Sequence, residues 1–226
     1  MARKILLVTA LLVTGVHCRS ESERAVADQP ETAGPGSREE RPVILFLGTS
    51  ITAGLGLDVE QAFPSLIQAA IDSVGFAFRV VNAGESGGTS AGGARRIAWL
   101  LRQPVSVLVL ELGANDGLRG RDVRAMKSNL QLIIDETKAK HPGARIVVAG
   151  MEAPPNMGVS YTTEFRQAFA DLARENDALL IPFLLDGVAG IRELNQADGI
   201  HPTAQGHRVI AKNVWDVLGP LLARLN

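Results

Sequence analysis

Five short apolar runs alternate along the chain with longer amphipathic stretches. The runs are rich in Val, Ile and Leu and cover Val43–Leu47, Phe78–Val81, Val105–Glu111, Arg145–Gly150 and Leu179–Ile181. Runs of this length predict strands that are buried on both faces. Helical periodicity marks the stretches between and after them, at Val59–Val74, Ala91–Arg102, Arg121–Lys140, Tyr161–Asn176 and Ala204–Leu222. Strands that alternate with helices indicate right-handed βαβ units, so we expect an α/β protein with a five-stranded parallel sheet in a three-layer α/β/α sandwich.

The first 40 residues do not share this alternation. Arg3 and Lys4 precede an apolar run, Ile5–Val16, that has the character of a secretion signal and is short for a membrane-spanning helix. We therefore expect residues 1–18 to be a signal peptide and the protein to be exported. Cys18 lies just past the run, where a bacterial lipoprotein is cleaved and acylated, although His17 stands where a small residue is expected. Cys18 is thus either a lipid-bearing membrane tether or an unmodified residue of the signal.

Residues 19–40 are polar and rich in Ser, Glu and Gly. This segment lacks the apolar side chains that would offset the entropy of ordering it, so we interpret it as a disordered linker. The folded domain is then expected to cover residues 41–226.

The composition excludes several classes of site. The formal net charge is −1 and 4% of the residues are aromatic, which argues against a nucleic-acid partner and against a stacking platform for bases or sugars. The single cysteine cannot form an intramolecular disulfide, and no Cys/His cluster has the spacing of zinc ligands. We expect a monomer that acts on a small molecule without a metal or a cofactor.

Four polar loops follow the predicted strands or precede the last helix. They are Gly48–Gly54, Asn82–Ser90, Gly113–Gly117 and Asp198–Pro202. In parallel sheets of this kind the functional loops lie at the carboxyl ends of the strands, so these four should meet at one edge of the sheet.

Together the loops contain the groups that an acyl-transfer site needs. Ser50 can supply a nucleophilic hydroxyl, His201 can take its proton, and Asp198 can hold the other imidazole nitrogen. The backbone N–H groups of Ser50 and Gly87, with the side-chain amide of Asn115, can bind the oxyanion. At Gly87 no Cβ would hinder the approach of the reacting carbonyl. This set predicts a serine hydrolase.

Each of these residues, taken alone, also has a structural explanation. A serine in a glycine-rich loop is more often a turn or cap residue. We interpret Asp116 as a cap or loop stabiliser, and Glu111, at the end of a predicted strand, as a structural carboxylate rather than a catalytic one. His141 lies at a predicted helix end, and His207 lies within the last helix, where it packs or faces solvent.

Three stretches carry a family resemblance: Val80–Ala83 with Ser86–Ser90, then Glu111–Gly120, then Asp198–Pro202. In them the chain resembles the SGNH (GDSL-type) hydrolases, whose four blocks each supply one of Ser, Gly, Asn and His. The resemblance assigns those roles to Ser50, Gly87, Asn115 and His201, with Asp198 as the family's Asp. It is closest to the bacterial periplasmic branch of thioesterases, lysophospholipases and arylesterases. It implies a flavodoxin-like fold and hydrolysis of short- to medium-chain acyl esters, aryl esters, acyl thioesters and lysophospholipids.

Two positions depart from the family pattern. The Gly-Asp-Ser-Leu opening has Thr49 in place of its Asp, and Gly88 stands where the close branch has an Asp after the oxyanion-hole glycine. Neither belongs to the catalytic set, so we expect activity with a changed rate, pH optimum or chain-length preference.

Other functions stay open on the sequence alone. A flavodoxin-like binding module would use the loop at 48–54 to hold a phosphate, but it leaves Asn115, Asp198 and His201 unexplained. A catalytically inactive surface lipoprotein that only binds acyl or glycan ligands would have no need of Ser50, Asp198 and His201 together. An α/β-hydrolase is disfavoured, because Ser50 follows the first strand and Thr52 stands where its motif has Gly.

The substrate is the least constrained part of the prediction. We expect the loops Gly117–Arg121 and Glu152–Tyr161 to border the acyl site, with Leu118, Met157 and Val159 as apolar contacts. Such contacts suit aliphatic acyl chains, and an acetylated carbohydrate is the alternative substrate.

Overall fold

The computed structural model describes residues 41–226. The predicted signal peptide (1–18), with Cys18, and the predicted linker (19–40) lie outside the described residues. The strands and helices are β1 Val43–Gly48, α1 Ser50–Ala53, α2 Phe63–Ser73, β2 Arg79–Gly84, α3 Ser90–Leu100, β3 Val105–Glu111, α4 Ala114–Leu118, α5 Val123–Lys140, β4 Arg145–Ala149, α6 Val159–Glu175, β5 Leu179–Ile181 and α7 Ala204–Leu225. Short 3-10 helices lie at Val59–Gln61 (η1), Pro155–Met157 (η2) and Arg192–Leu194 (η3).

The strands form one parallel sheet in the order β2-β1-β3-β4-β5. From β1 the chain adds β2 on one side, then crosses to β3 and continues outward to β5. The order reverses between β1 and β3, which are neighbours in the sheet. Loops that leave such a reversal point diverge and open a crevice between them. Ser50 and Asn115 closely follow β1 and β3, so the topology alone brings these two predicted site residues to the same part of the sheet edge.

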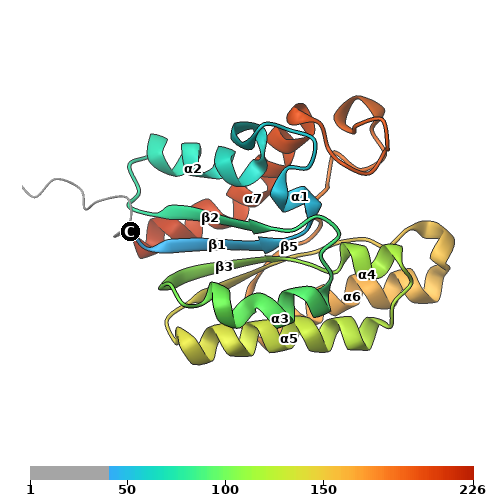
Figure 1. The fold of residues 1–226 in the computed structure, drawn as a ribbon, viewed down its shortest axis with the longest axis horizontal. Helices are drawn as coiled ribbons and strands as arrows, with labels where there is room; N and C mark the ends of the chain where they lie inside the picture. Colours follow the sequence, from blue (N-terminus) through green and yellow to red (C-terminus); the bar gives the residue numbers. More distant parts are fainter. Residues whose placement is uncertain (1–40) are drawn as a thin grey trace, which may run out of the picture. The chain divides into compact units, whose positions relative to one another are not determined.

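Helices cover both faces of the sheet, which confirms the predicted three-layer sandwich. On one face α2 packs against α7, and on the other α5 packs against α3 and α6 (Figure 1). Because both faces are covered, β1 is buried along its whole length and β3 along nearly all of it. Within residues 41–226, no helix has the length and apolarity needed to cross a membrane.

The predicted helix at Val59–Val74 is wrong in one respect, because the segment is divided. It consists of η1 and then α2, with Ala62 in extended conformation between them. Pro64 explains the break: a proline has no N–H to donate and is tolerated only in the first turn of a helix, where it lies here. Other differences are small, except that β2 extends to Gly84 and that the four-residue α1 and five-residue α4 were not anticipated.

His207 belongs to the core rather than to the surface. Its side chain is 1% exposed and stacks on the ring of Phe63 at a centroid distance of 6.1 Å. Its Nδ1 accepts a hydrogen bond from the Phe63 N–H at 3.0 Å, so the ring joins the first residue of α2 to α7. An acceptor nitrogen must be unprotonated. Burial lowers the pKa of His207 to about 4, which favours the same neutral form.

This lowered pKa predicts that acid weakens the fold. The unfolded chain binds the histidine proton first, since its pKa is near the ordinary 6.5, whereas the folded chain resists protonation down to about pH 4. The stabilisation is therefore complete above about pH 6.5 and is lost as the pH falls, by roughly 2 kcal/mol at pH 5. We expect denaturant unfolding at pH 7.5 and pH 5 to show this loss in the wild type but not in His207→Asn, which keeps an acceptor without titrating. An equal loss in both proteins would contradict the prediction.

Candidate active site

Ser50 lies at the sharp turn between β1 and α1. It is the first residue of α1 and is 8% exposed. The Thr49 hydroxyl caps the turn by accepting a hydrogen bond from the Ile51 N–H, and Gly54, with φ +74°, ends it in the left-handed conformation. A buried strand therefore holds this largely buried residue at the carboxyl edge of the sheet.

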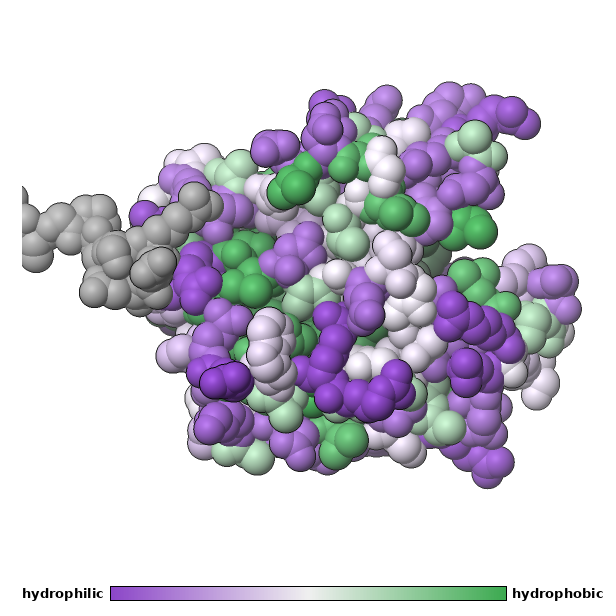
Figure 2. All heavy atoms as spheres, viewed as in Figure 1, coloured by the Kyte–Doolittle hydropathy of each residue, from purple (hydrophilic) through white to green (hydrophobic). Residues whose placement is uncertain are grey.

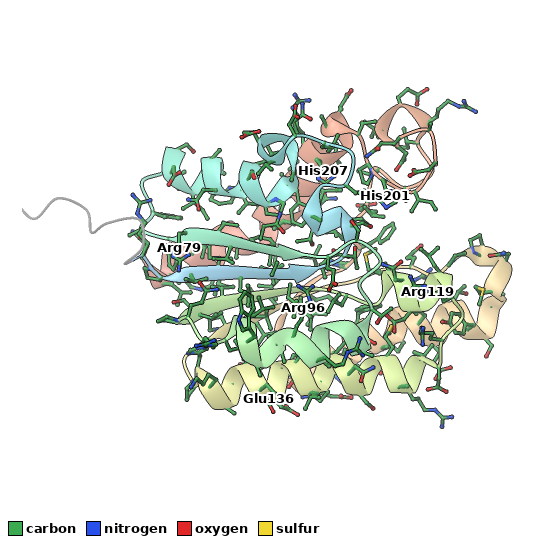
Figure 3. All side chains as sticks on the ribbon, viewed as in Figure 1. Arg79, Arg96, Arg119, Glu136, His201 and His207 are labelled. Carbon is green, nitrogen blue, oxygen red and sulfur yellow. The ribbon has the colours of Figure 1, made fainter. Side chains whose placement is uncertain are left out.

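Ser50, His201 and Asp198 form a continuous chain of hydrogen bonds. The His201 Nε2 is 2.9 Å from the Ser50 Oγ, and its Nδ1 is 2.6 Å from Asp198 Oδ2. Ser50 and His201 are 151 positions apart in sequence, and the fold brings them together. Figure 3 shows His201 at the end of the sheet where β1 leads into α1. With a proton on Nδ1, the imidazole would present Nε2 as an acceptor to the serine hydroxyl.

Asp198 is held in its ionised form by the loop that carries it. Its Oδ1 accepts hydrogen bonds from the backbone N–H groups of His201 (3.0 Å) and Ile200 (2.9 Å). These bonds, together with the contact to the His201 ring, keep the pKa of the Asp198 carboxyl well below its usual range. The carboxylate is thus fixed and ionised at neutral pH, where it can orient the imidazole.

Asn115 is hydrogen-bonded to the loop that follows β2, which contains Gly87. The Asn115 side-chain amide donates to the Gly88 carbonyl at 3.0 Å, which uses one of its two N–H groups. Gly87 has φ +75°, and both terminal nitrogens of Arg119 lie 3.4 Å from its carbonyl oxygen. A Cβ at position 87 would meet no heavy atom of the described residues closer than 3.8 Å. Backbone conformation, and not crowding within the protein, is therefore what requires glycine here.

Gly88, one of the two departures from the family, has a tighter environment. A Cβ there would lie 2.9 Å from the Glu85 carbonyl oxygen, which also accepts a hydrogen bond from the Gly88 N–H at 2.9 Å. The tight turn at 85–88 is thus built on a glycine at this position. An Asp at position 88 would require the turn to move, so this departure from the family pattern goes with a different turn geometry at 85–88.

Thr49, the other departure, contacts Glu111. The Thr49 N–H donates to Glu111 Oε2 at 2.8 Å, and its hydroxyl lies 3.0 and 3.1 Å from the two carboxylate oxygens. Glu111 is buried at 1% exposure and touches neither Ser50 nor His201 through a hydrogen bond. These contacts agree with its interpretation as a structural carboxylate.

Asp116 also has the structural contacts expected of it. Its two carboxylate oxygens accept hydrogen bonds from the N–H and the hydroxyl of Ser90, at 2.9 and 2.8 Å. Ser90 is the first residue of α3, so Asp116 joins α4 to the start of that helix. This bond fixes the position of the neighbouring Asn115.

Gln196 joins the His201 loop to the Ser50 loop. Its side-chain amide donates to the carbonyls of Leu55 (2.8 Å) and Pro202 (3.0 Å).

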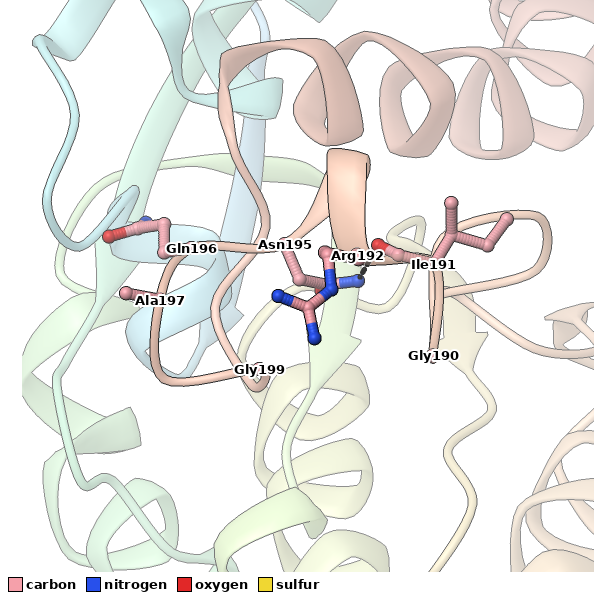
Figure 4. A pocket seen from close by; sticks show the side chains of 7 residues that line it. All are labelled: Gly190, Ile191, Arg192, Asn195, Gln196, Ala197 and Gly199. Carbon is pink, nitrogen blue, oxygen red and sulfur yellow. Dashed lines mark hydrogen bonds between the residues drawn. The ribbon is translucent and has the colours of Figure 1, made fainter.

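A cavity of about 370 Å³ adjoins the Asp198 loop on the side of η3 (Figure 4). Asn195 braces this region by donating to the carbonyls of Val188 and Ile191. The residues that line the cavity are Gly190, Ile191, Arg192, Asn195, Gln196, Ala197 and Gly199, and they do not include Ser50 or His201.

Apolar side chains project from three of the loops that carry predicted site residues. Leu55, Leu118 and Ile200 are 43–48% exposed, and we call them the apolar rim. Figure 2 shows hydrophobic side chains beside an indentation at the same end of the described part. Of the three, only Leu118 was among the predicted contacts. The signal for Ile200 was an apolar residue directly before His201 in an otherwise polar loop, whereas Leu55 had no comparable signal.

The other predicted apolar contacts, Met157 and Val159, belong to the loop predicted at Glu152–Tyr161. This loop touches the one predicted at Gly117–Arg121. A Cβ on Gly120 would lie 2.7 Å from the Met157 methyl group, and the Tyr161 hydroxyl donates to the Arg121 carbonyl at 2.8 Å. Val159 lines a cavity of about 590 Å³ whose remaining lining residues come from α5 and α6.

The donors within residues 41–226 do not form a metal centre. No group of three or more His, Asp or Glu side chains there is arranged to hold a metal ion. The site brings a hydroxyl, an imidazole and a carboxylate into one hydrogen-bonded chain, which is an arrangement suited to acyl transfer.

Comparisons with known proteins agree with this chemistry. A model of the GDSL-like Lipase/Acylhydrolase family matches residues 46–209. The chain is 40% identical over 180 residues to the esterase TesA of Pseudomonas aeruginosa, which covers 79% of this chain and 89% of that protein. It is 36% identical over 181 residues to thioesterase 1/protease 1/lysophospholipase L1 of Escherichia coli K12, covering 79% of this chain and 84% of the relative.

The structural comparison points the same way. A crystal structure of TesA matches with a TM-score of 0.75 and 40% sequence identity, and the match covers 79% of this chain and 99% of the other. The chain therefore belongs to the GDSL-like lipase/acylhydrolase family, the SGNH hydrolases, and is a carboxylic ester hydrolase.

Proposed function

We propose that the protein is a serine esterase and thioesterase that cleaves short- to medium-chain acyl esters through an acyl-enzyme on Ser50. The observation that carries the proposal is the hydrogen-bond chain from the Ser50 hydroxyl through His201 to Asp198. A hydroxyl is a weak nucleophile at neutral pH and needs a base within hydrogen-bond reach, with a third group to orient that base. The 2.9 Å and 2.6 Å contacts meet both requirements.

In the first half-reaction, Ser50 Oγ attacks the acyl carbonyl carbon while its proton passes to His201 Nε2. The new imidazolium is stabilised by Asp198, which stays ionised. The carbonyl oxygen becomes an oxyanion, and we assign its donors as the N–H groups of Ser50 and Gly87 with the second amide N–H of Asn115. The bond that Asn115 makes to the Gly88 carbonyl would aim this free N–H before substrate binds.

Collapse of the tetrahedral intermediate breaks the bond to the leaving oxygen or sulfur. His201 returns its proton to that atom, and an alcohol or thiol departs. Water then repeats the sequence: His201 takes a proton from water as the water attacks the acyl-enzyme, and returns it to Ser50 Oγ as the acid leaves. Every proton is accounted for by His201, so the cycle needs no cofactor.

The apolar rim favours an aliphatic acyl group over a sugar. Leu55, Leu118 and Ile200 offer exposed hydrocarbon on the segments that carry the proposed nucleophile, the oxyanion donor Asn115 and the base. Burying one methylene group on such a surface gains up to about 0.8 kcal/mol. Relatives named esterase and thioesterase/lysophospholipase support the same class of substrate.

We expect Ser50→Ala and His201→Ala each to lower kcat by about 10³-fold or more, because each removes a group that acts in the chemical step. Asn115→Ala should lower it by about 10²- to 10³-fold, the usual cost of one oxyanion donor. Hydrolysis of p-nitrophenyl butyrate by the purified variants measures these losses. Ser73→Ala and His141→Ala are matched controls, since both residues lie outside the site. A Ser50→Ala variant that keeps most of the activity would overturn the proposal.

We expect kcat/KM to rise with acyl length from acetate to a medium chain, by up to about fourfold per methylene group. A series of p-nitrophenyl esters, with an acyl-CoA and an acetylated sugar in parallel, measures this preference. Leu118→Ser and Ile200→Ser should flatten the series. Leu132→Ser, which changes an equally exposed leucine on α5, should not. A flat series with the acetylated sugar as the best substrate would favour the carbohydrate esterase instead.

We further propose that the protein is exported, either to the periplasm or to the bacterial envelope through a lipid on Cys18. The basis is the sequence: a basic start, an apolar run, and a cysteine just past its end. The full chain is expressed in a bacterial host that is given a labelled fatty acid. If Cys18 is lipidated, the wild-type protein should take up the label and appear in the membrane fraction. Cys18→Ala should lose the label. An unlabelled wild-type protein in the periplasmic fraction would support export and contradict lipidation.

A further inference from the structure

Glu111 is a buried carboxylate placed directly beneath the turn that carries Ser50. It ends β3, next to the end of β1 in the sheet register, where it pairs with Gly48. Its oxygens accept hydrogen bonds from the N–H and hydroxyl of Thr49 and from the hydroxyl of Thr52, the last at 2.7 Å. Thr49 and Thr52 flank Ser50 on either side, so one carboxylate holds both ends of the turn.

The carboxylate is held in place without a cation. Among the described residues, no Lys, Arg or His forms an ion pair with Glu111. Burial raises its pKa, and the bonds from Thr49 and Thr52 oppose that rise. Burying a carboxyl group in this way is unfavourable unless its bonds compensate, so a hydrophobic side chain would have been the simpler choice for stability alone.

The surrounding packing leaves the turn little freedom. A Cβ on Gly48 would lie 2.5 Å from Glu111 Oε2 and closer still to the Thr52 hydroxyl, so the backbone rests directly on the carboxylate. The Gly48 carbonyl is also fixed, by the Glu85 N–H at 3.0 Å and the Arg96 guanidinium at 3.2 Å. Glu111 thus supplies the bonds on the Thr49 and Thr52 side of a turn that is anchored elsewhere by β2 and α3.

We propose that Glu111 is a positioning residue for Ser50. It holds the turn at 49–52 so that the Ser50 hydroxyl meets His201 while the Ser50 N–H points at the substrate carbonyl. Thr49, where the family has an Asp, serves this role with a donating hydroxyl. The inference rests on the proposed function, because it assumes that Ser50 is the nucleophile. Glu111 itself is not a catalytic residue, since its hydrogen bonds go to Thr49 and Thr52 and not to Ser50 or His201.

The test is Glu111→Gln, which keeps the size and one acceptor oxygen but cannot accept all three donors. A misplacement of the order of 1 Å at a reacting atom costs about 10²-fold in rate. We therefore expect kcat to fall by about 10- to 100-fold with KM changed less than about threefold, and the rate of labelling by a fluorophosphonate to fall in parallel. Circular dichroism and thermal unfolding check that the variant is folded at the assay temperature.

Paired threonine variants separate positioning from general stability. Thr52→Val removes one donor to Glu111, whereas Thr137→Val removes an equally buried hydroxyl on α5 that bonds only within its own helix. We expect a loss of kcat only in Thr52→Val, even where both variants lose similar stability. Thr49→Ser, which keeps the hydroxyl, should retain kcat, and Thr49→Val should not.

Thr49→Asp tests the same contact through its pH dependence. It places two carboxyl groups within hydrogen-bond reach, and in the folded state such a pair shares a proton that the unfolded chain releases near pH 4. The melting temperature should therefore fall, relative to wild type, as the pH rises from 5 to 8, and Thr49→Asn should show no such fall. The other ionisable groups around the turn, Arg96, Glu85 and His201, are common to all three proteins.

The outcomes distinguish this inference from the proposed function. If the wild type is not labelled at Ser50, the proposed function fails. If the wild type is labelled and Glu111→Gln retains the wild-type kcat and labelling rate while folded, the positioning role is overturned. Equal losses of kcat in Thr52→Val and Thr137→Val would also overturn it, because they would make the effect one of stability.

Discussion

The parallel sheet is the constraint on which the rest of the molecule depends. Parallel strands need helical crossovers, and these crossovers return every loop that follows a strand to the same edge. The sheet order adds a reversal between β1 and β3, so the loops of Ser50 and Asn115 are neighbours that diverge. His201 arrives at this edge just before α7, and Gln196 bonds its loop to the Ser50 loop. The Ser50 hydroxyl, the His201 imidazole and the Asp198 carboxylate meet because the sheet order and the Gln196 bond bring their loops to the same edge.

Much of this could be predicted from the sequence because it follows from local pattern. The apolar runs at 105–111 and 179–181 coincide with β3 and β5. For β3 the reason is that a strand buried along nearly its whole length leaves an uninterrupted apolar signal. The four polar loops were predicted to meet at one edge, and the hydrogen bonds of Ser50, Asp198 and His201 do connect two of them. The roles of these residues in catalysis stay a proposal that activity measurements must test.

What the sequence did not reveal depends on contacts between distant segments. The bond from Thr52 to Glu111 joins positions 59 apart, and neither residue differs in pattern from an ordinary threonine or glutamate. Pro64 marks the break at Ala62 in the sequence, but the helical spacing of apolar residues over Val59–Val74 favoured a single helix. At Gly87 glycine was expected because of the substrate's approach, whereas the structure requires it for a positive φ. Periodicity reports which face is buried and says little about which atoms meet there.

Ser50 and His201, the two partners in the proposed proton transfer, lie on parts of the fold that differ in solvent protection. Ser50 follows a strand with six buried residues, while residues 197–200 are all exposed and are attached through a few side-chain bonds. Segments of the second kind open locally at a lower free energy than core strands. We therefore expect the amide hydrogens of β1 to exchange among the last in the domain, and those of residues 197–200 among the first. Losing the contact between Ser50 and His201 should then require opening of the histidine loop alone, with the sheet still intact.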